Sequence, residues 1–226
     1  MKGLILKDLY TVRFQIIVGL LIVLYPNLII FFLGGGMGIG GEDEMTGVIS
    51  VLLFGLLNYT NICLFSSFVL NTLAADVNSG WAKLQRTFPV SGSEIVGAKL
   101  IASGVVVGLL TAMSLVFNLA AALLFGLDVE FMITVPLCIG FYQMTVLAPL
   151  FPLAMRIGVK CTEVIYIVTE ILALVIAAFL MIKLLGTSLE AVLLRIIFYG
   201  GIPLLSAASC ALSFRLGKKA VQKAEL

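Results

Sequence analysis

Charge is scarce in this chain of 226 residues. Asp, Glu, Lys and Arg together make up 12% of it, and the formal net charge is +2. A soluble globular domain carries about 25% charged and about 45–50% apolar residues, whereas apolar types make up 62% here. So little polar surface cannot cover a soluble globule, and the small net charge argues against nucleic acid as a partner. We therefore expect an integral membrane protein.

Several chemical groups are also missing. The chain has no histidine, which excludes His-based metal sites, proton relays and Ser-His triads. Its four cysteines stand apart in apolar segments without a C-x-x-C pair, as is typical of small packing residues. No G-x-x-x-x-G-K-[ST] sequence occurs, so the chain has no phosphate-cradling loop. We predict no catalytic residue, no metal site and no cofactor bound by this chain, which is not expected to be an enzyme by itself.

Long apolar runs make up most of the chain, and one membrane-spanning helix needs about 20 residues. We predict an all-α polytopic fold in one transmembrane domain over residues 1–226. An interfacial helix over 1–11 precedes six spans, which are expected at about 12–33, 48–75, 93–125, 131–154, 163–184 and 193–216. Residues 187–203 are compatible with a separate outer helix. Within the third span, Gly104 and Gly108 form a small-x-x-x-small pair that would permit close helix contact.

The basic residues predict the orientation. Six crossings place every Lys and Arg except Lys183 and Arg195 on one side, and an excess of basic residues marks the cytoplasmic side. Both termini are therefore expected in the cytoplasm of a plasma membrane, with the acidic loop segments at 42–44 and 128–130 outside.

The cytoplasmic loop at 76–92 carries the most specific local pattern. Trp81, Leu84 and Phe88 fall on one helical face, while Lys83 and Arg86 lie off it. Ser91 and Glu94 then match a capping box that starts the third span. The loop is thus predicted to hold a short amphipathic helix, either anchored at the membrane surface or docked on a cytoplasmic partner.

Three motifs around this loop resemble the membrane subunits of type-2 ABC exporters, small six-helix permeases. They are Asp76-x-x-Ser79-Gly80-Trp81, Thr87-Phe88-Pro89-Val90-Ser91 and Glu94-Ile-Val96-x-x-Lys99. The opening segment Met1–Tyr10 is similar to their N-terminal connecting helix.

The resemblance implies that two permeases, identical or paralogous, pair around a central path above separate cytoplasmic ATPase subunits, which would bind ATP and Mg. The loop helix would be the coupling helix. Its candidate coupling residues are Asp76, Gly80, Trp81, Lys83, Leu84 and Arg86. The implied activity is export of an amphipathic or hydrophobic compound, such as a peptide, from a bacterial cell.

Polar residues inside the spans are candidates for the translocation path or for interhelical contacts, because lipid cannot satisfy them. In the second span these are Asn58, Asn61, Ser67 and Asn71. In the fifth span, Tyr166 and Glu170 share a face, and Glu170 lies deep in the membrane. An acidic group there is expected to face the bundle or a wet cavity.

Two alternatives stay open at this point. One is a non-transporting immunity or regulatory subunit, and the other is a small secondary transporter. A secondary transporter would more often show internal repeats and charged midplane sites, and no repeat is evident here.

Overall fold

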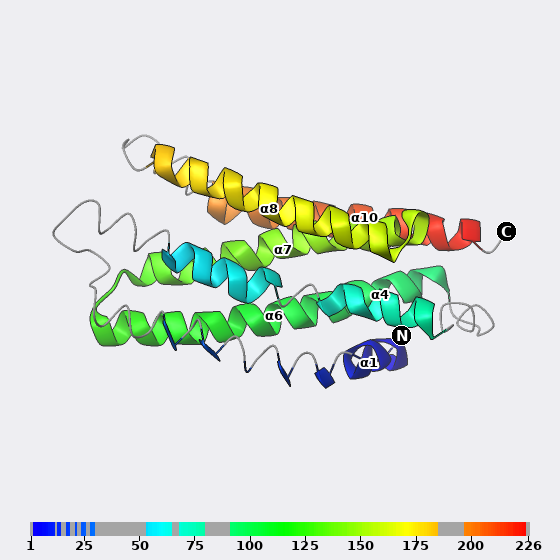
Figure 1. The fold of residues 1–226 in the computed structure, drawn as a ribbon, viewed down its shortest axis with the longest axis horizontal. Coiled ribbons are helices and arrows are strands. Elements are labelled where there is room, and N and C mark those ends of the chain that lie inside the picture. Colours follow the sequence, from blue (N-terminus) through cyan, green and yellow to red (C-terminus); the bar gives the residue numbers. More distant parts are fainter. Residues whose placement is uncertain are drawn as a thin grey trace.

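The computed structural model describes residues 2–11, 53–64, 68–79, 91–184 and 197–224, together with scattered residues between 13 and 29. Within these ranges the regular structure is entirely helical, without strands, as the sequence predicts. Figure 1 shows long helices running side by side along one axis. Helix α1 and the last turns of α10 lie at the same end of this bundle (Figure 1).

Besides the helical residues 53–59, the described elements with a label are six α-helices and two π-helical turns. They are α1 (Lys2–Thr11), η1 (Thr60–Leu64), α4 (Phe68–Asn78), α6 (Gly92–Phe125), α7 (Val129–Ile157), α8 (Val159–Leu184), η3 (Ile197–Gly201) and α10 (Ile202–Ala224). Helix α7 packs against α6, α8 and α10, whereas α1 and α4 pack on α6. Of the described helices, α6 and α7 are long and apolar enough to cross a membrane.

The ends of α6 are set by local chemistry. The predicted capping box is present, because the Glu94 amide donates to Ser91 Oγ at 3.3 Å and the Ser91 amide donates to the Glu94 carboxylate at 3.0 Å. At the other end Gly126 adopts a left-handed conformation with φ 67°, which glycine tolerates without a Cβ clash. The Asp128 side chain then accepts from the Glu130 amide at 2.9 Å and starts α7.

Two helix boundaries differ from the predicted ones. The polar link expected at 155–162 is helical except at Gly158, whose φ of 90° lets the chain turn between α7 and α8. The last helix begins at Ile202 and continues to Ala224 instead of ending near 216. Its added turns pack on α6, where an added Cβ on Gly217 would stand 2.8 Å from Val96 Cγ1.

The second predicted span is not one uniform helix. Residues 53–59 are α-helical, the turn η1 follows, and α4 runs on to Asn78. A π-turn places one extra residue in the turn and leaves backbone groups open to side-chain partners. The Cys63 carbonyl in η1 accepts such a bond from another helix, at 2.6 Å from the Tyr166 hydroxyl.

Prolines within α7 connect this helix to its neighbours. Proline has no N–H, so the carbonyl four residues earlier loses its helical partner. Pro136 frees the carbonyl of Met132, which accepts from Asn118 Nδ2 on α6 at 3.4 Å. Pro149 frees the carbonyl of Thr145, which accepts from Ser209 Oγ on α10 at 2.8 Å. Neighbouring helices thus satisfy groups that lipid could not.

The closest helix packing is not at the predicted glycine pair. An added Cβ on Gly108 would meet nothing within 4 Å, and one on Gly104 would meet only Met144 Cε at 3.8 Å. At Gly140 on α7, by contrast, an added Cβ would stand 2.5 Å from Thr111 Oγ1 on α6. The absence of a side chain at Gly140 therefore allows α6 and α7 to approach.

Candidate functional site

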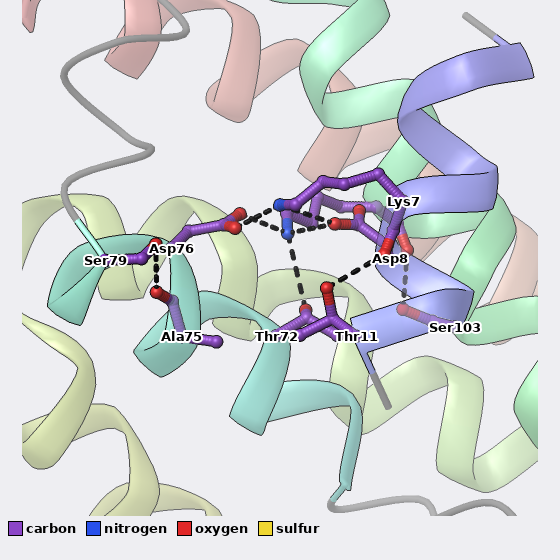
Figure 2. A network of polar contacts seen from close by, with 9 residues as sticks. Lys7, Asp8, Thr11, Thr72, Ala75, Asp76, Ser79 and Ser103 are labelled. Carbon is purple, nitrogen blue, oxygen red and sulfur yellow. Dashed lines mark hydrogen bonds and ion pairs between the residues drawn. The ribbon is translucent and has the colours of Figure 1, made fainter. Parts of the chain in front are cut away.

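Four charged side chains from three helices meet at the end of the bundle that carries α1 (Figure 2). Lys99 Nζ on α6 lies 2.9 Å from Asp8 Oδ1 on α1 and 2.6 Å from Asp76 Oδ2 on α4. Lys7 Nζ contacts the same two carboxylates, at 3.1 Å from Asp8 Oδ1 and through a short contact with Asp76 Oδ1. Thr72 Oγ1 accepts from Lys99 at 3.4 Å. We call Lys7, Asp8, Asp76 and Lys99 the charge cluster.

The charge cluster is neutral and largely shielded from solvent. Asp8, Asp76 and Lys99 are 3%, 5% and 4% exposed, whereas the Lys7 side chain retains 28% of its exposure. A buried charge is tolerated only when partners compensate for the water it has lost. The four groups therefore restrain α1, α4 and α6 at one point, because separating α4 or α6 would leave a buried charge unpaired and separating α1 would break its ion pairs with Asp76 and Lys99.

Three further hydroxyl groups near the cluster bond within their own helices. Thr11 Oγ1 donates to the Lys7 carbonyl at 2.8 Å, Ser79 Oγ to the Ala75 carbonyl at 2.6 Å and Ser103 Oγ to the Lys99 carbonyl at 2.7 Å. Each bond reaches back four residues, a common arrangement for Ser and Thr in helices. The carboxylates thus keep lysine ammonium groups as partners.

The charge cluster brackets the predicted coupling loop. Asp76 lies in the last turn of α4 and Lys99 in the second turn of α6. The loop residues 80–90 connect these two helices and lie outside the described residues. Because Lys99 and Asp76 are paired, the two ends of the loop are held together and are tied to α1.

A second polar group lies in the interior of the bundle. Asn118 Nδ2 on α6 donates to Asn58 Oδ1 at 2.9 Å, and Asn58 Nδ2 donates to the Phe54 carbonyl at 3.0 Å. Both side chains are fully buried. Asn61 is also fully buried, and neither of its amide atoms has a hydrogen-bond partner in the described structure.

A third set of contacts joins α8 to the second span and to α7. The Tyr166 hydroxyl donates to the Cys63 carbonyl at 2.6 Å and accepts from Gln143 Nε2 at 2.8 Å. The Tyr59 hydroxyl donates to the Glu170 carbonyl at 2.9 Å and makes a short contact with Glu170 Oε2. The predicted inward face of α8 therefore packs on protein.

The family model of the ABC-2 family transporter protein matches residues 3–218. The chain belongs to this family. No curated protein and no solved structure matches it. As an ABC-2 family member, the chain is a permease subunit of an ABC transporter, located in a membrane, and this membership implies association with an ABC ATPase subunit. The matched range includes the whole charge cluster and the polar interior.

The predicted coupling residues fall into two groups. Asp76 is buried in the charge cluster. The others lie in the loop outside the described residues, so their role stays a prediction: Gly80, Trp81, Lys83, Leu84 and Arg86.

The predicted polar residues of the spans also differ in where the structure places them. Asn58, Tyr166 and Glu170 contact other helices. Asn71 is partly buried on α4. Ser67 lies outside the described residues, and the structure tests no role in a path for any of these residues.

Several partners were not identified from the sequence. In the sequence, Asp8 and Lys99 stand out only as parts of family-like motifs, and no pattern distinguishes Asn118, Gln143 or Tyr59. A sequence signal exists for the first pair: an acid on α1, an acid at the end of α4 and a lysine at the start of α6 all lie on the predicted cytoplasmic side. Their pairing depends on how the three helices pack.

Proposed function

We propose that this permease forms part of an ATP-driven exporter in a bacterial plasma membrane. Two permeases, identical or paralogous, pair around a central path, and two cytoplasmic ATPase subunits bind ATP and Mg beneath them. The exported compound is amphipathic or hydrophobic, and a peptide is one candidate. Six crossings with both termini in the cytoplasm agree with the distribution of basic residues. Arg156 lies at the end of α7, Lys160 at the start of α8, and Lys218 and Lys219 near the end of α10.

The observation that carries the coupling proposal is the charge cluster. It joins the helices on both sides of loop 76–92 to α1 through buried ion pairs. A force that the ATPase exerts on the loop would therefore move α1, α4 and α6 together. This arrangement supports the role predicted for the loop helix around Trp81, because a coupling element needs a stiff connection to the membrane helices.

Co-purification with the ATPase tests this proposal. The permease is expressed with a candidate ABC ATPase from the same genome, and the complex is isolated through a tag on the permease. The double substitution Trp81→Asp and Leu84→Asp is expected to abolish retention of the ATPase, because it places two charges on the apolar face of the loop helix. Val129→Asp is the matched control: it adds a carboxylate at the exposed first turn of α7, at the far end of the bundle.

The outcome separates the candidate functions. Retention by the wild type and by Val129→Asp, with loss in the double variant, supports an ABC exporter coupled through loop 76–92. If the wild type itself retains no ATPase, the chain acts instead as an immunity or regulatory subunit. Retention by the double variant would contradict the coupling role of the loop.

A further inference from the structure

The carboxylate of Glu170 has no basic residue near it in the sequence. No Lys or Arg occurs at positions 14–82, 100–155 or 161–182. The nearest cations on its own helix are Lys160 and Lys183, which at 1.5 Å per residue are roughly 15 and 20 Å away along the axis. Helices α4 and α7, which contact α8, carry between them only one basic residue, Arg156, near the end of α7.

The immediate contacts of Glu170 leave one carboxylate oxygen unused. Oε2 contacts the Tyr59 hydroxyl, whereas Oε1 is buried and has no hydrogen-bond partner in the described structure. Glu170 also makes no ion pair with any described residue. A carboxylate at membrane depth must be neutralised or paired. Since no described residue supplies a cation there, we look for the compensating charge outside the described part of the chain.

A pair of aromatic rings adjoins this carboxylate through the Tyr59 hydroxyl. The centroids of Tyr59 and Tyr142 on α7 are 6.3 Å apart with an interplanar angle of 31°. The Tyr142 hydroxyl is buried without a hydrogen-bond partner. All three residues keep part of their surface exposed. An acid next to aromatic rings is a combination that can recognise organic ammonium groups, because ring faces attract a cation.

We propose that Glu170, Tyr59 and Tyr142 form a recognition site for a lipophilic organic cation, so that the transported substrate is a cationic amphiphile. The proposal rests on the proposed export function and specifies its substrate class. A proton alone would neutralise the carboxylate but would make no use of the two rings. A hard metal ion is disfavoured, because it needs about six oxygen ligands and the described residues offer no cluster of acidic, Cys or His side chains.

Direct binding of a cationic probe tests the site. Radiolabelled tetraphenylphosphonium is titrated against the permease–ATPase complex in lipid nanodiscs, and triphenylphosphine oxide serves as an uncharged probe of similar shape. We expect Glu170→Gln to weaken binding of the cation at least tenfold and to leave binding of the neutral probe unchanged. Glu163→Gln is the matched control, because Glu163 lies two turns earlier on the same face of α8.

A second pair of variants separates the ring from its hydroxyl. Tyr142→Leu removes the aromatic face and is expected to weaken cation binding severalfold. Tyr142→Phe keeps the ring and removes a hydroxyl that has no partner, so it is expected to bind like the wild type. This pair keeps the test valid if Glu170→Gln fails to fold.

Three binding results would each overturn the inference: equal cation binding by wild type and Glu170→Gln, equal weakening in Glu163→Gln, or tight binding of the neutral probe. Transport that depends on pH and on Glu170, without cation binding, would assign the site to a proton and would also overturn it. ATPase retention is measured on the same samples. A complex that retains its ATPase but does not bind the cation contradicts only the substrate class, whereas loss of the ATPase contradicts the proposed function.

Discussion

Replacing Lys99 with Met is the most direct perturbation of the charge cluster. The change keeps the length of the side chain and removes the ammonium group that contacts Asp8 and Asp76 at 2.9 and 2.6 Å. The two carboxylates are 3% and 5% exposed, and Lys7 becomes their single described cation. The charge of the cluster falls from zero to minus one at a site that is largely shielded from solvent.

Removing one partner from a buried ion pair costs about 3–5 kcal/mol, because the other charge is left unpaired. We expect Lys99→Met to lower the free energy of unfolding by an amount in this range and the apparent melting temperature by on the order of 10 °C. Lys7→Met should cost less, about 1–2 kcal/mol, because the Lys7 side chain is 28% exposed and Lys99 still bridges both acids. Combining Lys99→Met with Asp76→Asn restores neutrality, so the double variant should be more stable than Lys99→Met alone.

Thermal unfolding followed by a thiol-reactive dye measures this effect. Cys63 and Cys138 are buried and become reactive when the bundle opens, and Cys161→Ser removes the exposed thiol from the background. Lys160→Met is the control, because Lys160 is an exposed lysine at the start of α8. The reasoning is refuted if Lys99→Met melts no lower than Lys7→Met, or if adding Asp76→Asn lowers the melting temperature further.

Two other predictions concern the packing of α7. Gly140→Ala should destabilise the bundle by about 1–3 kcal/mol, because its Cβ would stand 2.5 Å from Thr111 Oγ1. Adding Thr111→Ala should recover most of the loss in the same dye assay, and failure to do so would place the strain elsewhere. Ser209→Ala should cost about 1 kcal/mol, because it leaves the Thr145 carbonyl without its donor. In a Pro149→Ala background, which restores an N–H to that carbonyl, the cost should shrink, and an equal cost in both backgrounds would contradict this account.

Much of the architecture follows from local sequence. Apolar runs long enough to cross a bilayer specify helices, and Ser91 with Glu94 starts α6 because their side chains satisfy free amides next to them in the chain. Glycine at 126 ends the same helix for an equally local reason. Such features depend on residues a few positions apart, so they can be predicted without knowing the fold. The family-like motifs are also properties of the sequence, and the family match over residues 3–218 agrees with them.

Other features exist only in the packed bundle. Neither the π-turn η1 nor the partner of its Cys63 carbonyl follows from periodicity, because that partner is Tyr166, 103 residues away. The glycine that allows close packing is Gly140 rather than Gly108, since α7 and not lipid lies against Thr111.

The scarce charges show this division most clearly. Their distribution along the sequence predicts a membrane protein and assigns most of the basic residues to one side. It does not show that Lys99 lies between Asp8 and Asp76, 91 and 23 residues away. Those pairs form because a buried charge requires a counter-charge, and only the packing of α1 and α4 on α6 brings the counter-charges within reach.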